Sequence, residues 1–180
     1  MLLAQDEASL YLQASILRVF APVGQTPVIR TDTQRDSTHF YGALNLVTGR
    51  ETVLRSDIMT ADASVLFLQQ VLDAYPGVPI VMFWDRAPWH QGSSIRSVLE
   101  ANPRLELVQF PPGCPELNPQ EHVWKAARTA VSHNHNYAKL PKLAQEFEFY
   151  LEKTCFPCSL LERHGYDLII TLNRPGKSDV

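Results

Sequence analysis

The amino-acid sequence predicts an α/β fold in which a mixed five-stranded sheet is flanked by helices. Three patterns in the 180 residues support this prediction. Residues 39–58 have the pattern of two strands joined by a tight turn at Gly49. The run Pro79–Trp84 is short, apolar and free of charge, which is typical of a strand buried on both faces. Helical patterns then alternate with strands, as in a chain that crosses back over its own sheet.

Each element follows from a local signal. "LLAQ", at residues 2–5, is expected to form a short first strand that ends before Asp6. A hairpin follows, with strands at His39–Val47 and Glu51–Ile58. Proline and glycine positions close most of the later elements. These are expected to be a helix at 61–75, a strand at 79–84, a helix from Ser93 or Ser94 to Asn102, a strand at 105–110, a helix at 119–132 and a helix at 142–153.

The first strands are expected to form an antiparallel meander, and the later strands are expected to join the same sheet through right-handed crossovers. All the strands then belong to one mixed sheet. This is the order of elements in a ribonuclease H-like fold. We expect a single domain of this kind over residues 1–172. Residues 173–180 are expected to form a flexible tail.

The composition limits the class of protein. Hydrophobic residues make up 45% of the chain, which is ordinary for a globular domain. The apolar runs fall short of the ~18 residues of a membrane span, and the N-terminus lacks a signal-peptide pattern. We therefore expect a cytoplasmic protein without a membrane partner. Cys155 and Cys158 have metal-ligand spacing, but no second pair accompanies them, so ordinary thiols are favoured over a structural zinc site.

The charge is slightly negative, −3 from 16 Lys+Arg and 19 Asp+Glu. This balance argues against affinity for nucleic acid over the whole surface and leaves room for a local basic patch. No acidic residue occurs from His122 to Gln145, where Lys125, Arg128, Lys139 and Lys142 lie. The spacing places Lys125 and Arg128 on one helix face with Glu121. This face is expected either to contact phosphates or to be an ordinary solvated surface.

Asp85 directly follows the apolar strand 79–84, and Pro88 prevents the strand from continuing. A carboxylate at the tip of a central strand is costly unless it is exposed, paired or bound to a metal. This position indicates a functional site.

Glu121 lies at the start of the predicted helix 119–132, three residues after Asn118. Taken alone, this spacing favours a capping glutamate that reaches back to the Asn118 amide. A helix, a strand and a loop separate Asp85 from Glu121, and such a crossover returns the chain to the same edge of the sheet. The two carboxylates are then expected to face each other across a cleft at the strand ends. Hard oxygen ligands of this kind suit Mg²⁺ or Mn²⁺.

Two motifs carry a resemblance to a known family. "FWDRAPWH" around Asp85 and "LVQFPPGCPELNPQEHVWK" around Glu121 resemble the insertion-sequence transposases of the mariner superfamily, the DDE endonucleases. The typical family forms are close to "DNAPWH" and "LPPYSPELNPIEHVWK". In this family the first acid lies on the opening strand, in a context similar to "AQDEASL", which points to Asp6. The resemblance covers about residues 1–150.

The resemblance implies a catalytic triad of Asp6, Asp85 and Glu121 that holds two Mg²⁺ or Mn²⁺ ions. Two such ions can clamp the attacking and leaving oxygens of a phosphoryl displacement. The implied activity is DNA strand cleavage followed by attack of the freed 3′-hydroxyl on target DNA. The implied partners are transposon ends, target DNA and a second copy of the chain, with a nucleoid-associated location and no small-molecule substrate. His90 and His122 are not expected to be ligands of such an oxygen-rich site.

Departures from the family forms leave alternatives open. Arg86 stands where the family has Asn, and it is expected either to pair with Asp85 and weaken metal binding or to contact a phosphate. Relatives usually carry an N-terminal helix-turn-helix region, which is absent before the first strand here, so sequence-specific DNA binding is expected to lie elsewhere. The rival interpretations are a nuclease that cuts without strand transfer and an inactive remnant that serves as an interaction module.

Overall fold

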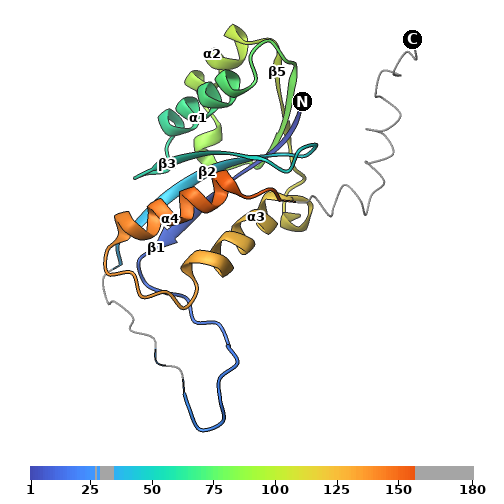
Figure 1. The fold of residues 1–180 in the computed structure, drawn as a ribbon. Helices are drawn as coiled ribbons and strands as arrows, with labels where there is room; N and C mark the ends of the chain where they lie inside the picture. Colours follow the sequence, from blue (N-terminus) through green and yellow to red (C-terminus); the bar gives the residue numbers. More distant parts are fainter. Residues whose placement is uncertain (27, 29–34, 157–180) are drawn as a thin grey trace, which may run out of the picture.

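The computed structural model describes residues 1–26, 28 and 35–156. Its five strands form one mixed sheet in the order β3-β2-β1-β4-β5 (Figure 1). β1, β2 and β3 are antiparallel neighbours, and β4 and β5 run parallel to β1. The strands are β1 at Leu2–Tyr11, β2 at Ser37–Asn45, β3 at Glu51–Ser56, β4 at Ile80–Trp84 and β5 at Leu105–Gln109. The predicted α/β class and mixed five-stranded sheet are confirmed.

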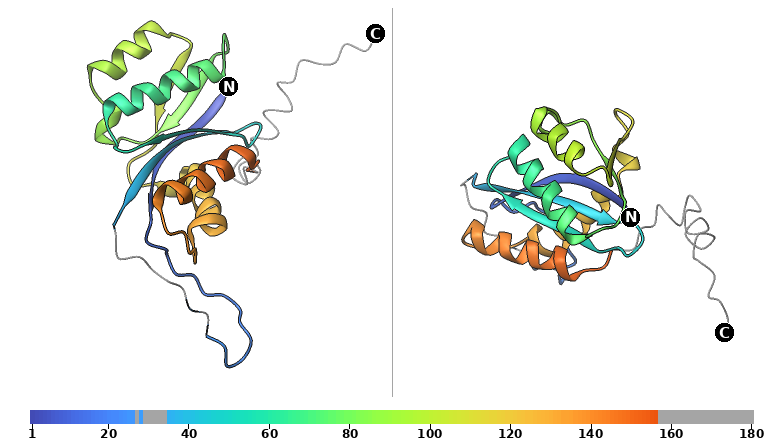
Figure 2. Two further views of the ribbon diagram at one scale, coloured as in Figure 1. Left: turned by 60° about the vertical axis from the view of Figure 1, so that its left-hand side comes forward. Right: turned by 90° about the horizontal axis from the view of Figure 1, so that it is seen from above.

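Helices cover both faces of this sheet (Figure 2). α1, at Ala61–Ala74, and α2, at Ser93–Ala101, pack on one face, and α3, at Gln120–Ala127, and α4, at Leu140–Lys153, pack on the other. Each layer therefore has its own core. α3 continues into a π-helical turn at Arg128–Ser132, so the helix expected at 119–132 is present with a change of winding. None of the helices in the described residues is long and apolar enough to cross a membrane.

The central strand β1 is longer than the sequence pattern predicts. The expected strand ended at Gln5, but β1 continues to Tyr11 and pairs with β2 over its whole second half. Asp6 and Glu7 interrupt the apolar pattern and suggested a strand end. Because neighbouring side chains of a strand point to opposite faces, these two carboxylates are separated and each finds its own partners. The strand end expected before Asp6 from the local pattern was wrong, because the pairing with β2 extends the strand beyond this residue, whereas the position of Asp6 on the opening strand, implied by the family resemblance, is confirmed.

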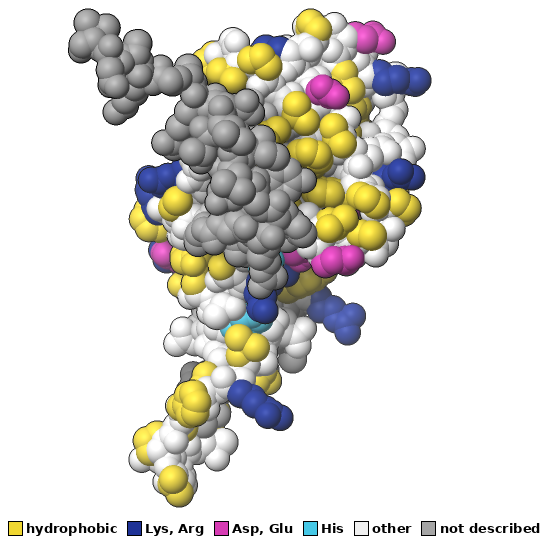
Figure 3. Space-filling view, turned by 90° about the vertical axis from the view of Figure 1, so that its right-hand side faces the viewer, with side chains coloured by type: hydrophobic (Ala, Val, Ile, Leu, Met, Phe, Trp, Pro, Cys, Tyr) yellow, Lys and Arg dark blue, Asp and Glu magenta, His cyan; other side chains and the backbone are white. Residues whose placement is uncertain are grey.

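A long connection between β1 and β2 leads away from the body of the fold (Figure 1). Apolar side chains lie along its described part, as the lower end of the surface in Figure 3 shows, and Phe20 and Val23 are fully exposed. Asn134, in a left-handed conformation, ties its base to the body. The Asn134 side chain accepts from the Leu17 amide at 2.9 Å and donates to the Leu17 carbonyl at 3.1 Å. The predictions for Cys158 and for the tail at 173–180 lie outside the described residues.

Glu51 places a carboxyl group beneath the start of α3. Its Oε1 atom accepts from Gln120 Nε2 at 2.6 Å, while Oε2 is buried without a partner among the described residues. Burial raises the pKa of Glu51 well above 4.5, and the Gln120 hydrogen bond offsets only part of this shift. A carboxyl group whose folded-state pKa is raised stabilises the fold at low pH and loses that contribution as pH rises.

We expect Glu51→Gln to flatten this pH dependence. Below about pH 4.5 both proteins carry a neutral group and should unfold at similar temperatures. At pH 7.5 the free energy of unfolding of the variant should be higher than that of wild type by about 1 kcal/mol, which corresponds to about 3 °C in Tm for a chain of this size. Glu106→Gln, at an exposed position of β5, is the matched control. Parallel Tm curves for wild type and Glu51→Gln between pH 4.5 and 8 would contradict the prediction.

Candidate active site

Asp6 and Asp85 are placed at the same level of the sheet by the register of two parallel strands. Ala4 of β1 pairs with Phe83 of β4. Asp6 lies two residues after Ala4, and Asp85 lies two residues after Phe83. β4 ends at Trp84, whereas β1 continues alongside β2. The sheet therefore opens between the two strands at this level, and both carboxylates lie beside the opening.

The start of α3 is tied to β1 by Asn118, which is buried. Its Nδ2 atom donates to the Gln5 carbonyl at 3.3 Å, and its Oδ1 atom accepts from the Gln120 amide at 3.1 Å. The helix begins one residue later than predicted, with Pro119 at the N-cap position. Among the described residues, the Glu121 side chain makes no hydrogen bond to the Asn118 amide, so the capping-box alternative is not realised. Glu121 is exposed instead.

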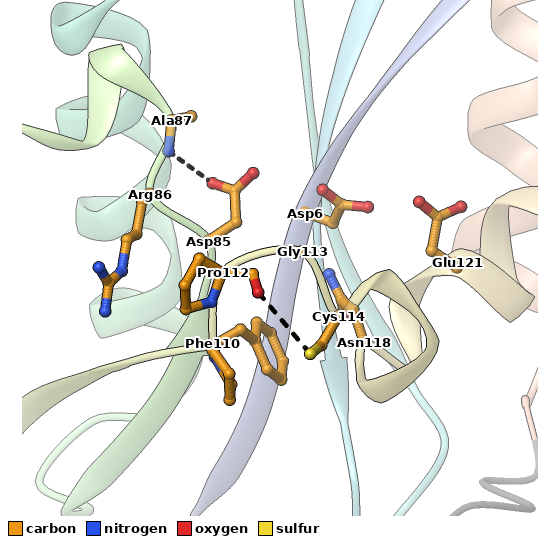
Figure 4. Close-up of a pocket in the computed structure, with 11 residues that line it drawn as sticks. Asp6, Asp85, Arg86, Ala87, Phe110, Pro112, Gly113, Cys114, Asn118 and Glu121 are labelled. Carbon is orange, nitrogen blue, oxygen red and sulfur yellow. Dashed lines mark hydrogen bonds between the residues drawn. The ribbon is translucent and has the colours of Figure 1, made fainter.

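The three acidic side chains that the sequence singled out line one pocket (Figure 4). Asp6 comes from β1, Asp85 from the end of β4 and Glu121 from the first turn of α3. The pocket has a volume of about 410 Å³. Its other wall is the loop after β5, and the remaining lining residues are Arg86, Ala87, Phe110, Pro111, Pro112, Gly113, Cys114 and Asn118. The tertiary fold thus brings together residues that are far apart in the sequence.

Asp6 is the most buried of the three carboxylates. The indole N–H of Trp124, itself 1% exposed, donates to Asp6 Oδ2 at 3.2 Å. The pKa of Asp6 is raised to about 7, mainly by burial and to a smaller extent by the negative charges of Glu7, Glu121 and Asp85, while a backbone hydrogen bond at Glu7 opposes the shift. Trp124 belongs to the buried core on this side of the sheet, and its contact with Asp6 was not predicted.

Asp85 is half exposed and is held through one oxygen. Its Oδ1 atom accepts from the Ala87 amide at 2.9 Å and lies 2.9 Å from His90 Nδ1. The hydrogen bond from His90 lowers the pKa of Asp85, and burial only partly opposes it. Arg86 points away from Asp85 in Figure 4. No ion pair joins these two side chains in the described residues, so the expected pairing of Arg86 with Asp85 is not formed.

Glu7 and His90 lie behind Asp85, on the α1 and α2 side of the sheet. His90 Nε2 lies 2.7 Å from Glu7 Oε1. Burial alone would lower the pKa of His90, but the hydrogen bonds to Asp85 and Glu7 outweigh it and raise the pKa to about 9. The sequence predicted that His90 is not a metal ligand and indicated no other role for it. Its place five residues after Asp85, in "DRAPWH", was the available signal.

The three pocket carboxylates are spread apart. Among the described residues, Glu7, Asp85 and His90 are the only three potential ligands whose atoms all lie within 4.8 Å of one another. Asp6, Asp85 and Glu121 do not meet this criterion. Mutual repulsion of three like charges favours such a spacing.

The basic residues that the sequence singled out do not form one group. Arg86 lines the pocket, and Lys125 is exposed one helical turn after Glu121. Lys142, on α4, forms an ion pair in which its Nζ atom lies 2.6 Å from Glu146 Oε1, so its positive charge is partly neutralised. Among the described residues, no ion pair joins Glu121 to Lys125, and both side chains are exposed. Arg128 is partly buried, and Lys139 is exposed just before α4.

The fold and the pocket together define a ribonuclease H-like domain with an acidic site at the ends of its central strands. Comparison with known proteins agrees with this class. The chain belongs to the DDE superfamily endonucleases, whose family profile matches residues 1–144.

Individual relatives are distant in sequence. The chain is 22% identical over 149 residues to the insertion element IS630 uncharacterized 39 kDa protein of Shigella sonnei, covering 82% of this chain and 43% of the relative. A Mos1 transposase paired-end complex has a TM-score of 0.63 at 13% identity, covering 85% and 48%. A pre-cleavage Mos1 transpososome has a TM-score of 0.66 at 11% identity, covering 98% and 57%. The chain therefore spans about half the length of these proteins.

Proposed function

We propose that this chain is the catalytic domain of a DDE transposase that cleaves DNA strands and transfers the freed 3′-hydroxyl to target DNA. One observation carries the proposal. Within a DDE family domain, Asp6, Asp85 and Glu121 come from three separate elements and line one pocket. We assign these three residues as the metal ligands and, through the metal, as the catalytic residues.

The residues present fit two divalent ions of the Mg²⁺ or Mn²⁺ type. All three carboxylates offer hard oxygen ligands, which these ions prefer. Burial raises the pKa of Asp6, the negative charges of Glu7, Glu121 and Asp85 add to this shift, and a bound cation would oppose it. The bound ions would supply charge neutralisation at the phosphate and a more acidic attacking water.

The chain itself supplies orientation. Trp124 fixes one oxygen of Asp6, and Ala87 fixes one oxygen of Asp85. Asn118 fixes the start of α3, and with it the position of Glu121, against β1. Fixed ligands reduce the reorganisation that must accompany the reaction, which is the main contribution a protein makes to phosphoryl transfer.

The DNA partner is supported by relatives whose structures are transposase–DNA assemblies, namely a Mos1 paired-end complex with a left transposon end and a Mos1 strand transfer complex. A paired-end assembly also supports a homodimer as the working unit. A protein with these partners would act on the DNA of the nucleoid. We assign phosphate contacts to Arg86, Lys125, Arg128, Lys139 and Lys142, with Arg86 and Lys125 nearest to the acidic pocket.

The test of the metal site is a crystal soaked in Mn²⁺ and read for anomalous signal. A peak bridged by two or more of Asp6, Asp85 and Glu121 is the expected result. An ordered Mn²⁺ bound elsewhere, with these carboxylates free, would overturn the assignment. Cleavage of end-labelled DNA without strand joining, under the same ions, would favour the nuclease alternative.

Lys125→Ala is expected to weaken DNA binding nearly uniformly across sequences. Removal of one phosphate contact should reduce the slope of log affinity against log salt by about 1. Arg96→Ala, at an exposed position of α2 on the opposite face of the sheet, is the control and should leave the slope unchanged. Fluorescence anisotropy over a range of salt concentrations measures both. Equal slopes for wild type and Lys125→Ala would remove this residue from the interface.

A further inference from the structure

His90 forms a buried bridge between two acidic side chains. Its Nε2 atom lies 2.7 Å from Glu7 Oε1, and its Nδ1 atom lies 2.9 Å from Asp85 Oδ1. The His90 side chain is 1% exposed and that of Glu7 is 4% exposed, whereas that of Asp85 is 49% exposed. The bridge therefore joins the buried interior to a carboxylate that reaches into the pocket.

The geometry favours a hydrogen-bonded bridge over a metal site. The three side chains lie close enough to hold one ion. However, the two carboxylates contact different nitrogens of the same imidazole ring, and these nitrogens point in different directions. A single ion accepts only one nitrogen from a ring, so the observed arrangement would have to be broken to form a three-ligand site. In the observed arrangement Nε2 faces the Glu7 carboxylate, and Nδ1 faces both Asp85 Oδ1 and, at 3.2 Å, the Asp85 main-chain carbonyl, so two N–H donors need no such change.

The bridge is held rigidly on its inner side. The His90 ring stacks on Trp84, with ring centroids 4.2 Å apart and an angle of 13° between the planes. Glu7 Oε1 also accepts from Gln5 Nε2 at 2.7 Å. Glu7 and Gln5 belong to the central strand β1, and Trp84 ends β4. His90 is therefore fixed by the two strands that define the pocket.

Asp85 is held by only one of its two oxygens. Both of its short contacts, from the Ala87 amide and from His90, end on Oδ1. Among the described residues, no donor contacts Oδ2. We propose that His90 is a positioning residue that orients the Asp85 carboxylate through Oδ1, leaves Oδ2 for a divalent ion and uses Glu7 as its anchor. This inference rests on the proposed function, because it requires Asp85 to be a metal ligand.

The expected size of the effect follows from other metal sites. Partners that orient a ligand typically change metal affinity by about 10–100-fold when they are replaced. Asp85 is half exposed, so without His90 its side chain would be free to rotate in the pocket. A loss at the lower end of that range, about tenfold, is the expected result.

Two substitutions of His90 separate orientation from folding. In His90→Asn the amide nitrogen takes a place near that of Nδ1 and can still donate to Asp85. In His90→Gln it takes a place near that of Nε2 and can donate only to Glu7. Each variant loses one hydrogen bond of the bridge. His90→Asn leaves the buried Glu7 carboxylate without this partner, so its Tm should fall more than that of His90→Gln. Mn²⁺ affinity, measured by electron paramagnetic resonance of the free ion, should fall about tenfold in His90→Gln and much less in His90→Asn.

Controls distinguish failure of this inference from failure of the proposed function. Asp85→Asn should remove the Mn²⁺ site, and His39→Gln, which loses a hydrogen bond to Ser9 far from the pocket, should leave it intact. If wild type and Asp85→Asn bind Mn²⁺ equally, the proposed function fails together with the inference. If binding depends on Asp85 but is equal in the two His90 variants, only the inference is overturned. DNA cleavage by His90→Gln should recover at high Mn²⁺ concentration, as expected for a defect in metal affinity.

Discussion

Asp85→Asn is expected to abolish divalent-ion-dependent DNA cleavage while the fold remains intact. The amide keeps the size of the carboxylate, and its oxygen can still accept from the Ala87 amide. It loses the negative charge that a divalent ion requires. Loss of one electrostatic element at a reacting phosphate costs about 10²–10³-fold in rate, and loss of the ion itself costs more. Single-turnover cleavage of labelled DNA in Mg²⁺ and in Mn²⁺ measures the effect.

The matched control is Asp57→Asn, which makes the same chemical change at an exposed position after β3. It should cleave at the wild-type rate. Asp85→Asn should show the wild-type circular dichroism spectrum and a modest fall in Tm, because His90 loses a charged partner. If the wild-type chain binds partners and Asp85→Asn retains all its behaviour, the chain acts as an interaction module and the catalytic assignment is wrong.

Gly42→Ala is expected to cause the largest loss of stability among single methyl additions in the sheet. Gly42 of β2 lies directly opposite Asp6 in the antiparallel register. A methyl group there would collide with the side chains of Gln120, Glu51 and Trp124. Gln120 and Trp124 belong to the α3 segment that also carries Glu121. Overpacking of this kind costs about 3 kcal/mol, or roughly 10 °C in Tm for a chain of this length.

The same substitution should also weaken Mn²⁺ binding, because displacement of Trp124 breaks its hydrogen bond to Asp6. Gly77→Ala is the control. Gly77 has a positive φ of 71° and open space around it, so a methyl group there introduces backbone strain of about 1 kcal/mol without a collision. It should lower Tm slightly and leave Mn²⁺ affinity unchanged. If the two substitutions lowered Tm and Mn²⁺ affinity equally, the packing around Gly42 would not be what controls stability and Mn²⁺ binding.

Most helices and strands could be predicted because their signals are local. The apolar run before Asp85, the turn at Gly49 and the prolines around the helices are each sufficient to mark an element. β1 is the exception. Its length depends on hydrogen bonding to β2. Asp6 and Glu7 interrupt the apolar pattern, so the local sequence does not indicate that the strand continues.

The sequence predicted which acidic residues meet at the strand ends and did not predict the side chains that hold them. Asp85 stands out because a strand tip is an unusual place for an unpaired acid. Glu121 stands out only together with Asp85, because the crossover between them returns the chain to the same edge of the sheet, and the family resemblance added Asp6. The contacts that hold these residues were not predictable. Trp124 and His90 reach their carboxylates through the tertiary fold, and the sequence separation between each of them and β1 is large.

The sequence by itself determined the fold class, the order of the elements and the identity of the three acidic residues. Periodicity, turn residues and motif spacing are properties of short segments, so they survive without knowledge of the rest of the chain. Only the tertiary structure decided that Arg86 points away from Asp85, that Glu121 does not cap its helix and that His90 links Asp85 to Glu7. These contacts depend on which side chains are neighbours across the sheet, and the register of β1 with β2 and β4 determines those neighbours.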